Sequence, residues 1–174
     1  MAIGVASVKA KDIAKVEPAL KLRFLSHGTL ASRDLDKSRQ FYEEFLGLDV
    51  IRTSPVSLMI RLGGPNTIAV VRDLSHTGGV HLNHNGLDVE NQEEVDAAYK
   101  VVTEQQEKWG ITKISKPLLQ HGTYAFFFAD QDDNWWEILT NPKGGYSWLF
   151  EHGGDFEGKG HQDKAFARPG VKTQ

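Results

Sequence analysis

The chain carries the same order of predicted elements twice, and this internal repeat restricts its fold more than any other feature. In each half, a strand-like segment precedes a segment with apolar residues at helical spacing, which ends at a glycine. Three short strand-like segments, separated by turn formers, complete the half. Each half is therefore predicted to be β-α-β-β-β. The segments are 22–32, 33–47, 48–54, 56–64 and 66–74 in the first half, and 79–89, 90–110, 111–119, 123–131 and 134–141 in the second.

The two halves also match at individual positions when they are laid over each other. His27 falls on His84, and Tyr42 falls on Tyr99. The identity is weak, but the matches fall at equivalent places in the same element order. Because internal repeats decide the architecture of a chain, we predict an α+β fold. Two βαβββ modules are expected to pair into a curved mixed sheet.

The repeat also divides the chain into regions. Residues 1–21 are expected to form a peripheral N-terminal arm. Residues 22–143 are expected to form the domain, with one module over 22–79 and the other over 80–143. Residues 144–174 are rich in glycine and charge and carry one aromatic cluster. We interpret them as a C-terminal extension that docks through that cluster.

Composition excludes several classes of function. The 174 residues have a formal net charge of −3, which gives no reason to expect nucleic acid or an anionic membrane as partner. The chain has no cysteine, so a metal would be held by nitrogen and oxygen atoms. No apolar run approaches the roughly 18 residues of a spanning helix, and the first residues lack the apolar block of a signal peptide. A cytoplasmic protein is expected.

Three polar residues lie within predicted strands among apolar neighbours: His27, His84 and Glu137. Burying an unpaired carboxylate costs on the order of a few kcal/mol. A single histidine in a strand is most often structural and bonded to a backbone group. Here, however, His27 and His84 are equivalent in the repeat, so a pseudo-two-fold axis would bring them to one cavity. Glu137 lies on the last strand of the second module.

Two imidazoles and one carboxylate make a 2-His-1-carboxylate ligand set, which leaves coordination positions open for substrate, water or dioxygen. These ligand types suit Fe(II), Mn(II), Zn(II), Co(II) or Ni(II). The residues alone therefore predict a divalent-metal site inside the curved sheet. Separate structural roles for the three residues remain the alternative.

Three stretches resemble the vicinal oxygen chelate superfamily. "SHGTLASRDLDKSRQFYEEFLGLDV" is similar to its N-terminal signature, and "HNGLDVEN" is similar to the first strand of its second half. "ADQDDNWWEIL" is similar to its last turn and strand, although Gln131 and Asp133 stand where proline and glycine are usual. The resemblance implies that His27, His84 and Glu137 are the metal ligands.

The resemblance also implies how many ligands the protein supplies. Related isomerases usually take a fourth ligand, a Glu or Gln, from the fourth strand. Here that strand offers Val70, Val71 and Arg72, with Asp73 near its end. A three-ligand site is similar to those of the extradiol ring-cleaving dioxygenases and of the fosfomycin-modifying thiol transferases.

We therefore expect an extradiol-type dioxygenase that uses Fe(II) to cleave a catecholic or other aromatic small molecule. In this hypothesis His121 is the acid/base and Tyr124 donates a hydrogen bond to a substrate oxygen. An apolar pocket beside the metal would be lined by Phe126, Phe128 and Trp135, although strand alternation sends about half of such aromatic residues into the core instead.

Other functions remain open on the sequence. One is a metal-dependent isomerase, epimerase or lyase, or a thiol transferase, of the glyoxalase and fosfomycin-resistance kind. Another is a metal-free binding protein of the bleomycin-resistance kind, although such a protein has no need of three convergent ligands. Folds of this type commonly dimerise, so we expect a homodimer.

Overall fold

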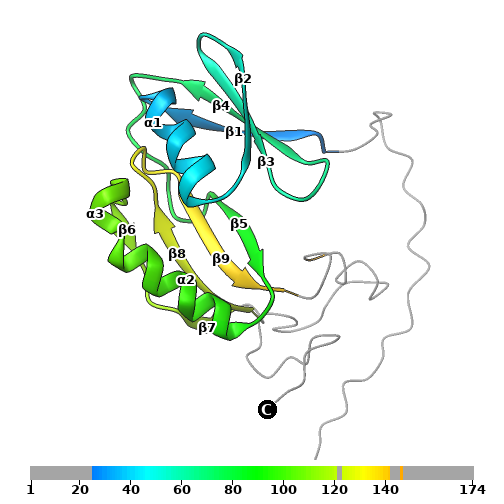
Figure 1. The fold of residues 1–174 in the computed structure, drawn as a ribbon, viewed down its shortest axis with the longest axis vertical. Coiled ribbons are helices and arrows are strands. Elements are labelled where there is room, and N and C mark those ends of the chain that lie inside the picture. Colours follow the sequence, from blue (N-terminus) through cyan, green and yellow to red (C-terminus); the bar gives the residue numbers. More distant parts are fainter. Residues whose placement is uncertain (1–24, 121–122, 142–145, 147–174) are drawn as a thin grey trace, which may run out of the picture.

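The computed structural model describes residues 25–120, 123–141 and 146. Within them the chain forms an α+β fold of two modules (Figure 1). The first module contains strand β1 (His27–Ser32), helix α1 (Leu35–Gln40), a π-helical turn η1 (Phe41–Phe45), and strands β2 (Asp49–Ser54), β3 (Ser57–Arg61) and β4 (Thr67–Arg72).

The second module repeats this order with two interruptions. It contains strand β5 (His84–Val89), helices α2 (Gln92–Glu104) and α3 (Gln106–Trp109), and strands β6 (Lys113–Ile114), β7 (Leu118–Gln120), β8 (Thr123–Ala129) and β9 (Trp135–Thr140). The predicted helix over 90–110 is broken at Gln105, and the predicted strand over 111–119 becomes β6 and β7. The α+β class and the repeated βαβββ order are thus confirmed. None of the helices described is both long and apolar enough to cross a membrane.

Side-chain caps explain where the two main helices begin. The Asp34 carboxylate accepts hydrogen bonds from the backbone N–H groups of Asp36 and Lys37, and it caps α1. The Asn91 side chain accepts from the N–H of Glu94 and caps α2 in the same way. Such caps satisfy N–H groups that the helix leaves without a partner.

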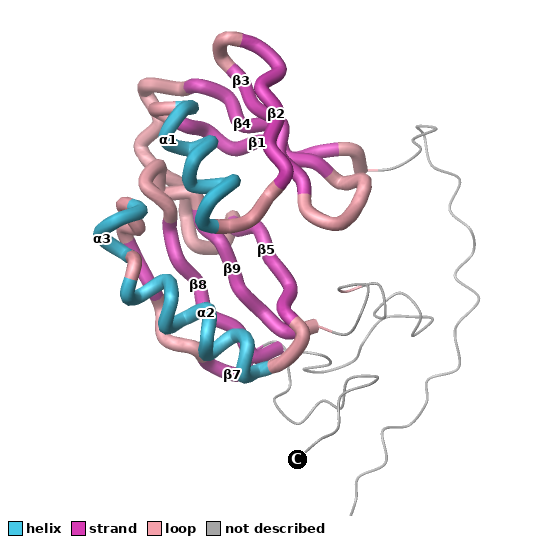
Figure 2. The backbone as a smooth tube through the Cα atoms, viewed as in Figure 1, coloured by secondary structure: helices cyan, strands magenta, loops and turns pink. Residues whose placement is uncertain are grey.

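Each module builds its own mixed sheet, as Figure 2 shows in magenta. The first sheet has the order β1-β4-β3-β2, and the second has the order β5-β9-β8-β6, with β7 added beside β8. In both sheets the first strand of the module runs parallel to its last strand, and the other pairs are antiparallel. Among the described strands, β1 and β5 each have one partner, so both are edges.

The helix-covered faces of the two sheets share one core. Tyr42 of η1 contacts Trp136 of β9, with 5.8 Å between ring centroids, and Phe45 contacts Phe128 of β8 at 6.4 Å. Leu58 from the first sheet is fully buried in the same cluster. Because the modules pack through their helix sides, the opposite faces of the sheets do not contribute to this core.

A buried polar turn between β8 and β9 fastens the modules together. Arg33 of the first module donates to the Asp132 carboxylate at 3.0 Å, and Ser38 donates to it at 2.9 Å. The Asn134 side chain donates to the backbone carbonyl of Ala31 at 2.9 Å. This turn also sets where β9 begins, and β9 carries Glu137.

Candidate metal centre

The structure brings His84 and Glu137 together. His84 is the first residue of β5, and Glu137 lies in the middle of the adjacent strand β9, where it is opposite Gly86. The distance from His84 Nε2 to Glu137 Oε2 is 3.3 Å. Glu137 is buried, at 7% exposure, so its carboxylate is largely removed from water.

The second ring nitrogen of His84 shows which tautomer it adopts. His84 Nδ1 lies 2.9 Å from the backbone oxygen of His81. A carbonyl oxygen only accepts, so Nδ1 carries the proton, and in the neutral ring Nε2 presents a lone pair to the Glu137 carboxylate. Two acceptors facing each other are stabilised by a proton or a cation between them. Metal-ligating histidines commonly donate their other N–H in this way, so the pair fits a divalent metal.

Aromatic rings surround this pair on one side. His81 packs edge-on against Phe127, with centroids 4.3 Å apart, and against Trp135 at 5.0 Å. Phe127 also lies 4.9 Å from the His84 ring. The indole N–H of Trp135 donates to the backbone oxygen of Gly79 at 3.2 Å. The result is an apolar wall beside a buried carboxylate.

Two of the predicted pocket residues lie elsewhere. Phe126 and Phe128 are fully buried on the helix side, and Phe126 contacts Tyr99 of α2. The register places Phe127 directly opposite Glu137. The structure thus places Phe126 and Phe128 one step of alternation away from the face of Glu137, because three consecutive phenylalanines do not reveal which of them faces the glutamate. Trp135 does share the face of Glu137.

Of the two predicted catalytic residues, only Tyr124 lies in the described part of the chain, and it is not brought to the pair. Tyr124 lies on the helix side of β8, and its hydroxyl donates to Asp96 of α2 at 2.8 Å. That bond raises the pKa of Tyr124. The structure thus gives Tyr124 no place beside Glu137 within one chain. His121 lies outside the described residues.

The sequence reasoning missed residues that the structure places around the pair. The His81 backbone orients His84, and its ring closes the apolar wall. Gly86 leaves room for the Glu137 carboxylate, since a Cβ there would lie 3.7 Å from Glu137 Oε2 and 3.2 Å from Leu139. Burial raises the pKa of Tyr146, and the charge of Glu137 contributes to that rise. In the sequence, the spacing of three between His81 and His84 is a signal that could have pointed to His81.

His27 is separated from the other two predicted ligands. It begins β1 on the face that is turned away from α1, where its ring is exposed and its Nδ1 lies 2.8 Å from the hydroxyl of Ser26. Within the described ranges, no three His, Asp or Glu side chains converge. The reason lies in the shared core: sheets that pack through their helix sides direct their other faces apart.

The fold and the convergence of His84 with Glu137 define a βαβββ-repeat protein with a buried histidine–carboxylate pair. A family model described as the Glyoxalase/Bleomycin resistance protein/Dioxygenase superfamily matches residues 24–138. The chain belongs to this superfamily, and the predicted vicinal oxygen chelate membership is confirmed. No curated protein sequence matches the chain.

Solved structures share the fold at low identity. A hypothetical protein from S. aureus is 24% identical, with a TM-score of 0.52, and covers 69% of this chain and 98% of its own. A possible glyoxalase from Bacillus cereus is 19% identical, with a TM-score of 0.56. The match covers 68% of this chain and 99% of the glyoxalase. The fosfomycin resistance protein FosX from Listeria monocytogenes, solved in complex with Mn(II) and sulfate, is 21% identical, with a TM-score of 0.55. The match covers 75% of this chain and 99% of FosX.

Proposed function

We propose that the protein is a mononuclear divalent-metal enzyme that acts on a small molecule, of the glyoxalase and fosfomycin-resistance kind. One observation carries this proposal: His84 Nε2 and Glu137 Oε2 converge at 3.3 Å, while His84 Nδ1 is held by a backbone carbonyl. This geometry prepares one nitrogen and one oxygen for the same cation. A metal-free binding protein remains the alternative, because a proton shared by His84 and Glu137 would also stabilise the pair.

A second copy of the chain would supply the third ligand. The face of the first sheet that carries His27 also exposes apolar side chains: Ile51 is 64% exposed and Val71 is 39% exposed. Covering such a face with a second copy removes this surface from water. In a two-fold dimer, His27 of the second copy would meet His84 and Glu137 of the first, and the reciprocal contact would form a second site.

The metal supplies Lewis acidity when it is bound: it polarises substrate oxygen atoms and neutralises charge that develops on them. The protein's own contribution is to hold the ligands in place and to keep water from the apolar side. His81 fixes the ring of His84, and Phe127 and Trp135 form the wall. The ligand types accept Mn(II) or Fe(II), and also Zn(II), Co(II) or Ni(II).

Ring cleavage of an aromatic substrate remains the second candidate. The aromatic wall of His81, Phe127 and Trp135 favours an apolar or aromatic substrate. However, Tyr124, the predicted donor to a substrate oxygen, is committed to Asp96 on the helix side. This placement favours Lewis-acid chemistry, such as isomerisation or addition to an activated small molecule, over oxygen activation.

Metal content and oxygen consumption test the proposal. The protein, purified without added metal and then loaded with Mn(II) or anaerobically with Fe(II), is expected to hold about one ion per chain by mass spectrometry of the elements. Glu137→Gln and His84→Ala are expected to lose that ion. If the Fe(II) form consumed oxygen in the presence of catechols, ring cleavage would become the first candidate function. Wild-type protein that retains no ion would contradict both metal functions.

A further inference from the structure

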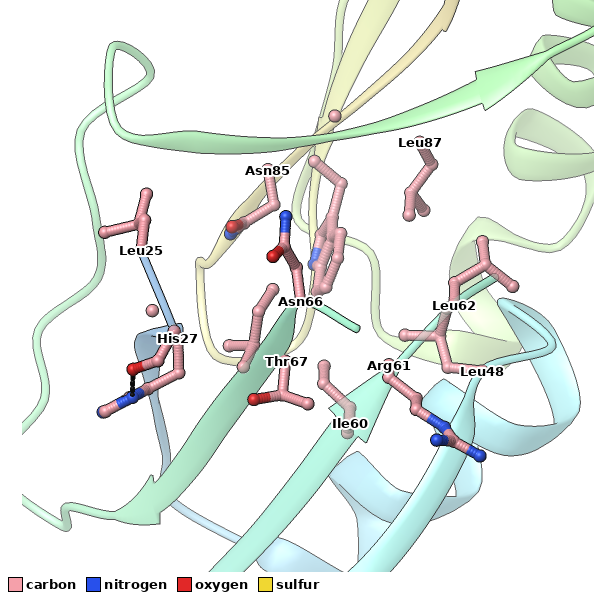
Figure 3. Close-up of a pocket in the computed structure, with 15 residues that line it drawn as sticks. Leu25, His27, Leu48, Ile60, Arg61, Leu62, Asn66, Thr67, Asn85 and Leu87 are labelled. Carbon is pink, nitrogen blue, oxygen red and sulfur yellow. Dashed lines mark hydrogen bonds between the residues drawn. The ribbon is translucent and has the colours of Figure 1, made fainter. Parts of the chain in front are cut away.

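We propose a second binding site, in a pocket between the edge strands of the two modules, for a small neutral molecule with an apolar body and an amide group. His27, a proposed metal ligand, is among the residues that line this pocket, but the proposal does not depend on a bound metal. The pocket has a volume of about 520 Å³, and Figure 3 shows its lining. Ligand sites in proteins are typically about 300–1,000 Å³, so the space suits a ligand of one or two rings.

The pocket is separated from the metal pair by strand β5. Its wall includes Leu87 and Trp136, both on the helix side of the second sheet, whereas Glu137 faces the other side. Gly86 contributes its backbone to both sites: it lines the pocket, and its missing side chain would point toward Glu137. A ligand in the pocket would therefore lie one strand away from His84 and Glu137.

Most of the pocket surface is apolar. Leu48, Ile60 and Ile68 line it from the first module, and Leu87 and Trp136 line it from the second. Filling such a space with an apolar ligand removes the ligand's surface from water. This accounts for the apolar body that we assign to the ligand.

Two asparagines supply the polar groups of the pocket. Asn66, just before β4, and Asn85, in β5, lie on opposite modules, and Figure 3 shows their amide groups turned toward each other at the centre of the pocket. Neither side chain makes a hydrogen bond to another residue that the structure describes. An asparagine amide offers one acceptor and two donors, and an amide on a ligand matches that pattern with both kinds of group.

Charge in the lining favours a neutral ligand. No aspartate or glutamate is among the described lining residues, so a cation would have no counter-charge. Arg61 is at the rim, but its guanidinium already donates to Asp49 at 3.0 Å and is turned away from the two asparagines in Figure 3. An anion would lose its hydration without gaining a dedicated partner.

Binding of 2-naphthamide to chelator-treated protein tests this site. Titration followed by ¹⁵N–¹H NMR is expected to show saturable shifts at Asn85, Leu87 and the indole of Trp136. Naphthalene-2-carboxylate, which has the same ring and a negative charge, is expected to bind at least about threefold more weakly, because a charge loses more on leaving water. Equal binding of the carboxylate would overturn the neutral class, and the absence of saturable shifts would overturn the site.

Two variants locate the binding. A Cβ on Gly28 meets nothing within 4 Å, and Gly28 lines the pocket, so the side chain of Gly28→Leu starts in open space beside the pocket. It is expected to weaken 2-naphthamide binding about tenfold or more, since it occupies the ligand's volume. Gly64→Leu is the matched control, since Gly64 is equally open and does not line the pocket. Unchanged binding by Gly28→Leu would place the ligand elsewhere.

Asn85→Leu keeps the proposal testable if Gly28→Leu does not fold. It is expected to lower the affinity for 2-naphthamide about fivefold or more, because it removes the amide partner and leaves the apolar walls. His84→Ala, which removes a proposed metal ligand, is expected to bind 2-naphthamide as the wild type does. If Asn85→Leu kept its affinity for 2-naphthamide, Asn85 would not be a ligand contact. If His84→Ala lost that affinity, the pocket would belong to the metal centre, which would contradict a separate site.

Discussion

Two residues near the module junction hold unusual states that follow from their immediate surroundings. Gly78 has φ of 98°, a conformation that side chains rarely adopt, and a Cβ there would lie 2.8 Å from Asp133 Cβ. Asp130 is a buried acid whose oxygens accept from the backbone N–H groups of Asp132 and Asn134 and from the indole of Trp136. Burial raises its pKa to about 6 despite these donors. Each state leads to a measurable consequence.

Gly78→Ala is expected to lower the free energy of unfolding by about 1–3 kcal/mol, because it adds both backbone strain and a clash with Asp133. Urea unfolding measures the change. Gly64→Ala is the control, since Gly64 has no positive φ and open space around its Cβ, and it is expected to change stability by less than about 0.5 kcal/mol. Equal effects of the two substitutions would contradict the assigned conformation of Gly78.

Asp130 is expected to make stability fall as pH rises. Its pKa is about 6 in the folded protein, against 3.8 for an unperturbed aspartate, so the folded state binds this proton more tightly. The contribution is fully present below about pH 4 and is lost by about pH 6–7, a difference of about 3 kcal/mol. Urea unfolding between pH 4 and 7 is expected to show this component in the wild type but not in Asp130→Asn. An identical pH profile for the variant would refute the raised pKa.

At the scale of elements, strand alternation decides which side chains reach the site. In β8, Phe127 faces Glu137, whereas Tyr124, Phe126 and Phe128 face the helices. In β9, Glu137 faces away from the helices and Trp136 enters the core. A single step of alternation therefore separates a site residue from a core residue.

Tyr124→Phe tests this assignment. It removes the bond to Asp96 on a partly exposed helix side and is expected to cost about 0.5–1 kcal/mol of stability. Metal content and turnover are expected to stay at the wild-type level once a substrate is known. A large loss of turnover with full metal content would return Tyr124 to the role of substrate donor.

Much of the element order was predictable because periodicity and turn residues are local signals. The repeat predicted the βαβββ order, and Glu137 and His84 stood out as polar residues in apolar strands. The choice among Phe126, Phe127 and Phe128 was not predictable, because it depends on the register between β8 and β9. The turn of Asp130 and Asp132, which joins the modules, depends on contacts with residues nearly a hundred positions away, such as Arg33.

At the scale of the whole molecule, the packing of the modules explains why the candidate site is incomplete in one chain. Tyr42, Phe45 and Leu58 join the sheets through their helix sides, so His27 is carried away from His84 and Glu137. The separation of His27 from the other two proposed ligands within one chain thus follows from the core that stabilises the fold. The proposed second copy would cover the exposed face around Ile51 and would supply the missing ligand.

Placing a charge on that face tests the role of a second copy. Ile51→Glu is expected to dissociate the dimer, because it places a carboxylate on a surface that association would bury. The molecular mass measured in solution and the metal content are expected to fall together. Thr53→Glu, also exposed on β2 and nearer the end of the strand, is a milder control. Dissociation with full metal content would show that one chain holds the ion by itself.

Metal content of mixed copies tests the central claim most directly. His27→Ala and His84→Ala proteins are each expected to hold little metal when prepared alone. In a co-expressed equal mixture, half of the dimers would pair one chain of each kind, and each of these would contain one intact site. The mixture is therefore expected to recover about a quarter of the wild-type metal content. A mixture that holds no more metal than its separate components would contradict a site shared between two copies.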